Sequence, residues 1–178
     1  GGADPSVAFD RNGNAYFVSL ETTVRTRSLW VRRSTDGGAA WTRGNTPIAD
    51  TAHFPDKPHL AIDLSRDTMY TAWVMIDNDA IAEPTDVQIF FSRVSTAGWD
   101  LRWSAPVCIS DTMSGTTCQG PNLAIAPNRT LYAVWASYDP TGSSAEDAIS
   151  FSRSTNGGVT WSPERRIIGV QGIRAFNP

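Results

Sequence analysis

Short apolar runs and longer alternating segments recur in pairs along the chain, and a tight turn separates the members of each pair. The apolar runs cover residues 7–9, 60–62 and 123–125, and the alternating, aromatic-rich segments cover residues 15–18, 70–74 and 131–135. Apolar runs of this length fit strands buried on both faces, whereas alternation fits strands with two unlike faces. No stretch keeps the 3.6-residue period of a helix, so the pattern predicts an all-β protein with almost no helix.

The same order of residues returns three times, which indicates an internal repeat. Prolines open the units at Pro5, Pro58 and Pro121, arginines follow 60 residues apart at Arg33, Arg93 and Arg153, and tryptophans close them at Trp41, Trp103 and Trp161. Each unit is predicted to form four strands: the apolar run, the alternating segment, a third strand, and a strand that carries the closing tryptophan. Four-stranded units that repeat every ~40–60 residues are typical of β-propeller blades.

The repeats predict a β-propeller segment of three four-stranded antiparallel blades. The predicted blades span residues 5–51, 58–111 and 121–169, and residues 170–178 start a fourth blade with Pro178 at its opening position. Because a propeller needs roughly 4–8 blades to close, the chain is expected to be part of a larger propeller of about six blades. The alternative is a half-propeller that assembles with a second chain.

The glycine-rich turns after the third strands carry a family resemblance. Residues 34–41 read Ser-Thr-Asp-Gly-Gly-Ala-Ala-Trp, and residues 154–161 read Ser-Thr-Asn-Gly-Gly-Val-Thr-Trp. Both resemble the Asp-box, or BNR repeat, of sialidase-like proteins, whose pattern is Ser-x-Asp-x-Gly-x-x-Trp, and residues 95–103 hold a degenerate copy. The matching residues are Ser34, Asp36, Gly38 and Trp41 in the first turn and Ser154, Asn156, Gly158 and Trp161 in the third.

A residue such as Asp36 in this turn has two readings, a catalytic carboxylate or a brace for the turn. An Asp or Asn side chain accepts hydrogen bonds from turn amides, and glycine adopts a positive φ without strain, so the structural reading is favoured. The resemblance implies that the Asp-boxes lie on the face opposite the active site. Counting strands agrees, because it puts the blade connections and the long loops between second and third strands on the other face.

That other face gathers the candidate chemistry. It collects Asp4, residues 53–57, Gln119 and Arg174 from the blade connections, and Arg25, Arg27, Asp77, Asp79, Tyr138, Asp139, Glu146 and Asp147 from the long loops. Carboxylates that bind hydroxyl groups, beside aromatic rings that stack on a sugar, suit a glycan. The candidate substrate-binding residues are His53, Asp56, Lys57 and Arg174. An ion pair that ties neighbouring blades is the alternative reading of Asp56 and Lys57.

The resemblance also implies a catalytic set. Sialidases hold the substrate carboxylate with three arginines, use a tyrosine with a glutamate partner as the nucleophile, and use an aspartate as the acid/base. Tyr138 and Glu146 have the chemistry of the nucleophile pair and are the candidate catalytic residues. The Phe-Arg-Ile-Pro motif of many sialidases is absent, so the catalytic set is not complete in this chain.

Charge and composition exclude several classes of protein. The chain has 18 acidic and 15 basic residues, a formal net charge of -3 and a single lysine, which argues against a nucleic-acid or anionic-membrane surface. No apolar run approaches the ~18 residues of a membrane span. Two histidines without nearby cysteine or glutamate partners make no zinc site, so neither a metal nor a cofactor is expected.

Cys108 and Cys118 are the two cysteines and bracket the connection between the second and third blades. This arrangement favours a disulfide, with two free thiols as the alternative, and a disulfide implies an extracellular or periplasmic protein. The leading hypothesis is therefore an exported, sialidase-like propeller segment that recognises glycans as part of a glycoside hydrolase. The rival hypothesis is a non-catalytic propeller that acts as a protein-interaction scaffold. The expected partners are a glycan, or remaining blades in the same protein or a second chain.

Overall fold

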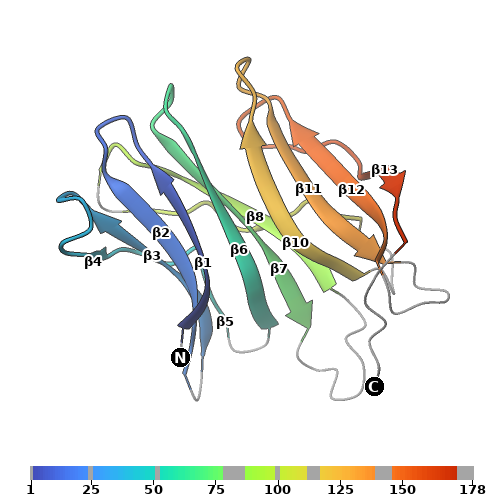
Figure 1. Ribbon diagram of the computed structural model, residues 1–178, viewed down its shortest axis with the longest axis horizontal. Helices are drawn as coiled ribbons and strands as arrows, with labels where there is room; N and C mark the ends of the chain where they lie inside the picture. Colours follow the sequence, from blue (N-terminus) through green and yellow to red (C-terminus); the bar gives the residue numbers. More distant parts are fainter. Residues whose placement is uncertain are drawn as a thin grey trace.

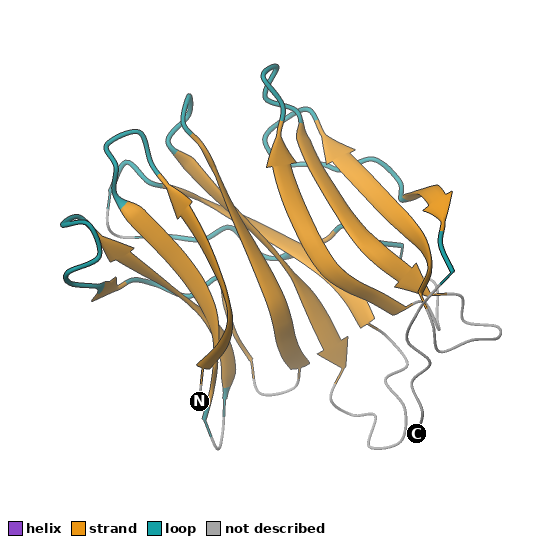
Figure 2. Ribbon diagram, in the orientation of Figure 1, coloured by secondary structure: helices purple, strands orange, loops and turns teal. Residues whose placement is uncertain are grey.

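The chain is a segment of a β-propeller with three antiparallel blades. A computed structural model describes residues 2–23, 26–50, 53–77, 87–98, 101–111, 117–138 and 146–171. Every regular element within these ranges is a strand, and none is a helix (Figure 2). No helix in the described part of the chain is therefore a candidate for a membrane span.

Each blade is a meander of successive strands. Blade 1 holds β1 (Gly2–Phe9), β2 (Ala15–Thr22) and β3 (Arg27–Ser34), with β4 (Thr42–Arg43) and β5 (Ile48–Asp50) both paired to β3. Blade 2 holds β6 (His53–Asp63), β7 (Thr68–Asp77), β8 (Val87–Ser95) and β9 (Val107–Cys108). Blade 3 holds β10 (Thr117–Ile125), β11 (Leu131–Tyr138), β12 (Glu146–Ser154) and β13 (Arg165–Gly169). The predicted opening of a fourth blade falls mainly on residues outside the described ranges.

The blades stand side by side with their first strands adjacent (Figure 1). Strand β6 contacts both β1 and β10, so the first strands form the inner edge that the three blades share. Among the residues that the structure describes, all strand pairs are antiparallel except one bridge, in which Thr117 of β10 pairs in parallel with Val87 of β8. That bridge joins blades 2 and 3 into one sheet of eight strands.

The hydrophobic core lies between the blades. Alternate residues of β7 enter two different cores: Met69, Trp73 and Met75 pack with blade 1, whereas Tyr70, Ala72 and Val74 pack with blade 3. Blade 2 is thus buried on both faces, which explains why its central strands read as nearly continuous apolar runs. Blade 1 differs from this prediction, because Val7 and Phe9 of its apolar run are each 59% exposed. Among the described residues, the strand contacts of β1 are with β2 of its own blade and β6 of blade 2, so no second blade covers its other side.

The closing tryptophans do not lie in strands, contrary to the sequence prediction. Trp41, Trp103 and Trp161 all precede the outermost strands of their blades. Ser104, directly after Trp103, donates one backbone hydrogen bond to Arg93 O of the third strand at 2.8 Å. Ser162, directly after Trp161, donates the equivalent bond to Arg153 O at 2.9 Å. A proline follows Ser162 and has no N–H to extend this pairing.

The two glycine-rich turns that resemble Asp-boxes have the same internal hydrogen bonds. In the first, Ser34 Oγ accepts from Gly38 N at 2.9 Å, and Asp36 Oδ1 accepts from Ala40 N at 2.9 Å. In the third, Ser154 Oγ accepts from Gly158 N at 2.9 Å, and Asn156 Oδ1 accepts from Thr160 N at 3.0 Å. Gly38 and Gly158 have φ values of 95° and 82°, a region that glycine enters at little cost.

The predicted disulfide between Cys108 and Cys118 is not confirmed, because both residues are free thiols. The Cys108 thiol instead donates weak hydrogen bonds at 3.5 Å to Gln88 Oε1 and to Ser110 O. Cys118 is fully buried in the core between blades 2 and 3. Burial raises the pKa of Cys118 to about 12, so this sulfur is a poor nucleophile for oxidation.

Candidate functional site

The first strand of every blade carries a bulge at its proline. The residues before the three prolines have positive φ: Asp4 at 51°, Lys57 at 46° and Gly120 at 62°. The pairing register with the second strand shifts at each of these places. Proline removes one ladder donor, and a positive φ strains any residue other than glycine. Bulges of this kind re-aim side chains, and strained backbone gathers at functional sites.

The first two bulges bring two carboxyl groups together across the boundary between blades 1 and 2. The side chains of Asp4 and Asp56 are hydrogen-bonded to each other. That bond is the main reason why the pKa of Asp4 is raised, and burial and the negative charge of Asp56 add to the shift. A neighbouring carboxylate disfavours ionisation, because two negative charges close together repel each other. Asp4 therefore keeps a proton to a higher pH than an ordinary aspartic acid.

Lys57 supplies the positive charge of this group. Its Nζ lies 3.0 Å from Asp56 Oδ2, and the side chain is about half exposed. Sequence analysis selected Asp4, Asp56 and Lys57 separately but missed the carboxyl pair. The signal was present, since Asp4 directly precedes one bulge proline and Asp56 stands two residues before the next.

The third bulge contributes an amide. Gln119 stands before Gly120, as Asp56 stands before Lys57, and its Oε1 is buried without a hydrogen-bond partner among the described residues. A buried acceptor without a donor needs an explanation, such as a donor that arrives with a ligand. Gln119 is thus a candidate acceptor on the same inner edge as the carboxyl pair.

The other predicted residues surround this edge to different extents. His53 and Phe54 begin β6, and the Arg27 guanidinium lies 4.9 Å from the centre of the Phe54 ring. Tyr138 ends β11 and is the register partner of Glu146 in β12, so the predicted nucleophile pair is adjacent along the sheet. The side chain of Glu146 lies outside the described part of the chain, as does all of Arg174.

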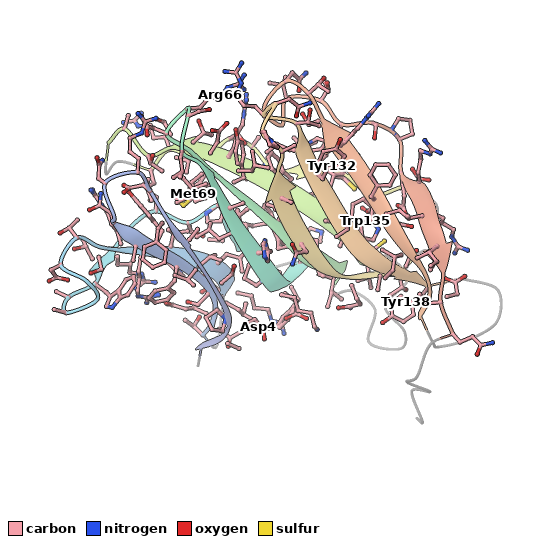
Figure 3. All side chains as sticks on the ribbon, turned by 45° about the horizontal axis from the view of Figure 1, so that its top comes forward. Asp4, Arg66, Met69, Tyr132, Trp135 and Tyr138 are labelled. Atoms are coloured by element: carbon pink, nitrogen blue, oxygen red, sulfur yellow. The ribbon has the colours of Figure 1, made fainter. Side chains whose placement is uncertain are left out.

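The candidate residues share one end of the molecule. Asp4 and Tyr138 lie toward one end of the molecule, and Arg66 and Tyr132 lie toward the other, beside the hairpin turns (Figure 3). Asp4 belongs to blade 1 and Tyr138 to blade 3, so blade 2 stands between them. Within the described ranges, no group of three His, Cys, Asp or Glu side chains is arranged to hold a metal ion.

A hollow of about 320 Å³ lies elsewhere, on the side of the hairpin turns. It is lined by residues of β7, β8 and the following segment, including Thr68, Arg93, Ser95 and Ser104. None of the carboxyl pair or Lys57 lines it. The site built from the bulges is therefore separate from this hollow.

Comparison with known proteins gives a fold but no family. No family model matches the chain, and no curated protein is similar enough to count as a match. Among solved structures, an α-L-arabinanase from Penicillium chrysogenum is 11% identical, with a TM-score of 0.69 over 93% of this chain and 50% of that one. A Hadza microbial sialidase is 14% identical, with a TM-score of 0.66 over 94% of this chain and 38% of that one.

A xylan β-1,4-xylosidase from Bacillus halodurans is 15% identical, with a TM-score of 0.65 over 96% of this chain and 33% of that one. A protein of unknown function from Dyadobacter fermentans is 16% identical, with a TM-score of 0.66 over 93% of this chain and 50% of that one. The chain thus spans about half, or less, of the solved structures that it resembles. These likenesses identify the fold as that of glycosidase-type β-propellers.

Proposed function

We propose that this chain is the glycan-recognising part of a glycosidase-type propeller, with its binding group at Asp4, Asp56 and Lys57. Gln119 and Tyr138 extend the same surface on blade 3. Further blades, in the same protein or in a second chain, complete the ring and the catalytic set, and the protein works outside the cell, where polymeric glycans are met. The proposal combines the chemistry of the inner edge with the glycosidase names of several solved structures that share the fold.

The observation that carries this proposal is the hydrogen-bonded pair of Asp4 and Asp56. Two neighbouring carboxyl groups offer several acceptors to sugar hydroxyls within one small area, and the raised pKa of Asp4 extends the pH range in which it also offers a donor. Lys57 adds a cation at 3.0 Å from Asp56 Oδ2. A group with both donors and acceptors suits a sugar ring, because each sugar hydroxyl can donate and accept a hydrogen bond.

The separation of the two carboxyls limits what they do alone. The carboxyls of glycosidases stand about 5–5.5 Å apart in retaining enzymes and about 6.5–9.5 Å apart in inverting ones. Asp4 and Asp56 interact through a hydrogen bond, which is a closer approach than either of these arrangements. They act as one acidic unit, and a second catalytic group, such as Tyr138 with Glu146 or a residue from another blade, is needed for hydrolysis.

Binding experiments with short glycans test this proposal. Sialyllactose, arabinobiose and xylobiose are titrated into the protein by NMR, with Asp56→Asn as the test variant and Asp67→Asn as the control. Asp67 pairs with Arg11 at 2.9 Å on the opposite face, so its substitution also removes one carboxylate from an ion pair. At least one sugar is expected to bind with a Kd of about 0.1–10 mM, and Asp56→Asn is expected to weaken it at least tenfold.

Two results would refute the proposal. One is the absence of binding by all three glycans, and the other is equal affinity of the two variants. No hydrolysis of a fluorogenic sialoside is expected from this chain, because its own residues hold only part of the set that must be positioned for reaction.

A protein-interaction scaffold is the second candidate, and one observation favours it. The outer side of blade 1 exposes Val7 and Phe9, each 59% accessible. Exposed apolar side chains that lie together mark contact surfaces for proteins. This function predicts that a protein partner, and no sugar, protects these two residues.

A further inference from the structure

At each boundary between blades, a backbone N–H of the following blade donates a hydrogen bond to a side chain of the preceding one. Ser6 Oγ of blade 1 accepts from Leu60 N of blade 2 at 3.0 Å, and His59 Nδ1 of blade 2 accepts from Leu123 N of blade 3 at 3.1 Å. Ser6 and His59 each follow the proline of a bulge. Asn122 follows the third bulge proline, carries an acceptor of the same kind, and is exposed.

A second contact joins the third strand of one blade to the glycine-rich turn of the next. Arg93 Nη1 of blade 2 donates to Gly157 O of blade 3 at 3.0 Å. Arg153 stands at the position of Arg93 in blade 3 and makes no side-chain hydrogen bond to the described residues. Gly37 stands at the position of Gly157 in blade 1, where the turn is exposed.

The same two faces differ in their apolar contacts. In blade 2, Tyr70, Ile89 and Phe91 face blade 3 and are at most 1% exposed. Their register equivalents in blade 3 are Tyr132, Ile149 and Phe151, which are only partly buried. Blade 3 therefore presents the face that blades 1 and 2 use to receive a following blade, and no described residue covers it.

Blade 1 presents the complementary half of this contact. Val7 and Phe9 occupy the positions of Leu60 and Ile62, which pack against blade 1. Val7 pairs with Phe17 in the same register as Leu60 pairs with Thr71, so its amide has the same place on the outer side of its strand. The two free faces of the chain are thus the two halves of one kind of blade contact.

We propose that the free face of blade 3 docks blade 1 of a second copy of this chain. In that contact Asn122 accepts from the second copy's Val7 amide, and Arg153 donates to its Gly37 carbonyl. Two copies joined in this way have two identical contacts and form a closed ring of six blades, within the roughly 4–8 blades that propellers use.

The charged side chains on the outer side of blade 1 do not oppose this docking. Glu21 pairs with Arg32 and, at 3.1 Å, with Arg43. The Arg43 guanidinium also lies 3.5 Å from the centre of the Trp30 ring. Because the carboxylate is already paired within its own blade, covering this face buries no unpaired negative charge.

Light scattering after size-exclusion chromatography tests the proposal on the chain as it stands. The mass is expected to rise from 19.3 kDa to twice that value as the concentration increases from about 1 to 100 µM. Val134→Glu places a carboxylate in the middle of the blade 3 face and is expected to raise the dimer Kd at least tenfold. Val159→Glu, at a residue that is 53% exposed on the turn of the same blade, is the matched control and is expected to leave dimerisation unchanged.

A double variant protects the test against misfolding of Val134→Glu. Asn122→Ala with Arg153→Ala removes both proposed contacts at exposed positions, and circular dichroism monitors its fold. This double variant is also expected to raise the dimer Kd at least tenfold. A monomer at every concentration, a series of masses beyond the dimer, or a dimer unaffected by either variant would overturn the proposal.

Discussion

Gly158 offers the sharpest test of how the blades pack. It has a φ of 82°, and a Cβ at this position would lie 2.4 Å from Cε1 and Cζ of Phe91 in the neighbouring blade. Gly158→Ala therefore adds a left-handed backbone cost of about 1–2 kcal/mol to an overpacking cost of about 1–3 kcal/mol. The expected loss in the free energy of unfolding is about 2–5 kcal/mol, a large share of the roughly 5–15 kcal/mol that stabilises a typical domain.

A control glycine separates the two costs. Gly37 has a φ of 71°, and a Cβ there meets nothing within 4 Å. Gly37→Ala is thus expected to cost only the backbone part, about 1–2 kcal/mol. Urea denaturation of both variants, monitored by tryptophan fluorescence, gives the two free energies.

Shortening Phe91 then tests the contact itself. Phe91→Leu combined with Gly158→Ala is expected to be less destabilising than the sum of the single changes by about 0.5–3 kcal/mol. Equal losses for Gly158→Ala and Gly37→Ala, together with additive behaviour of the double variant, would refute the packing of the third glycine-rich turn against blade 2.

Three further predictions concern titratable groups. Burial lowers the pKa of His59, so the free energy of unfolding decreases as the pH falls from about 6.5 towards the lowered pKa. His59→Asn, which places the residue of position 122 at position 59, is expected to remove this decrease in urea titrations from pH 7 to pH 5. The raised pKa of Asp4 gives the opposite pH dependence, because the folded protein gains stability as the pH falls towards about 3.9. Asp4→Asn should therefore stabilise the protein more at pH 7 than at pH 3.5. An equal effect at both pH values would exclude the carboxyl pair. Thiol titration of the denatured, unreduced protein should find both Cys108 and Cys118, with Cys118 unreactive before denaturation because it is fully buried; no titratable thiol would restore the disulfide.

The blades could be predicted because their signals are local. Apolar triplets, tight turns and the alternation around Tyr70 report the backbone period directly, and the structure has strands at each of these places. The outermost strands were less predictable. Trp161 was expected in a strand, but after it only one backbone–backbone hydrogen bond, from Ser162 N to Arg153 O, joins the chain to the third strand before β13 begins at Arg165. A large aromatic side chain favours a strand only where a partner edge is available, which the sequence does not specify.

The candidate site was predictable in position but not in chemistry. Strand counting placed Asp56 and Lys57 at the end of the blade opposite the glycine-rich turns. The structure agrees, because both residues lie in the first half of β6, whereas these turns follow the ends of β3 and β12. The pairing of Asp4 with Asp56 depends on bulges in two strands that are about 50 residues apart in the sequence, and no local pattern reports such a register. The exposure of Val7 was also missed, because burial of an apolar run depends on the neighbouring blade.

The contrast between repeated and unrepeated positions argues for where function resides. Register partners Tyr16 and Arg33 recur in the other blades as Tyr70 with Arg93 and Tyr132 with Arg153. These positions face the next blade, and each blade must fit the same kind of neighbour, so the residues stay alike.

The bulges on the inner edge follow the opposite rule. Their backbone is the same in all three blades, yet the two residues before the proline read Ala3-Asp4, Asp56-Lys57 and Gln119-Gly120. A positive φ at Asp4 and Lys57 costs free energy that glycine avoids in the third blade, so packing alone would favour glycine throughout. The bulge residues therefore keep a strained backbone, differ from blade to blade and share one edge. This combination is what a binding site on a repeated scaffold requires.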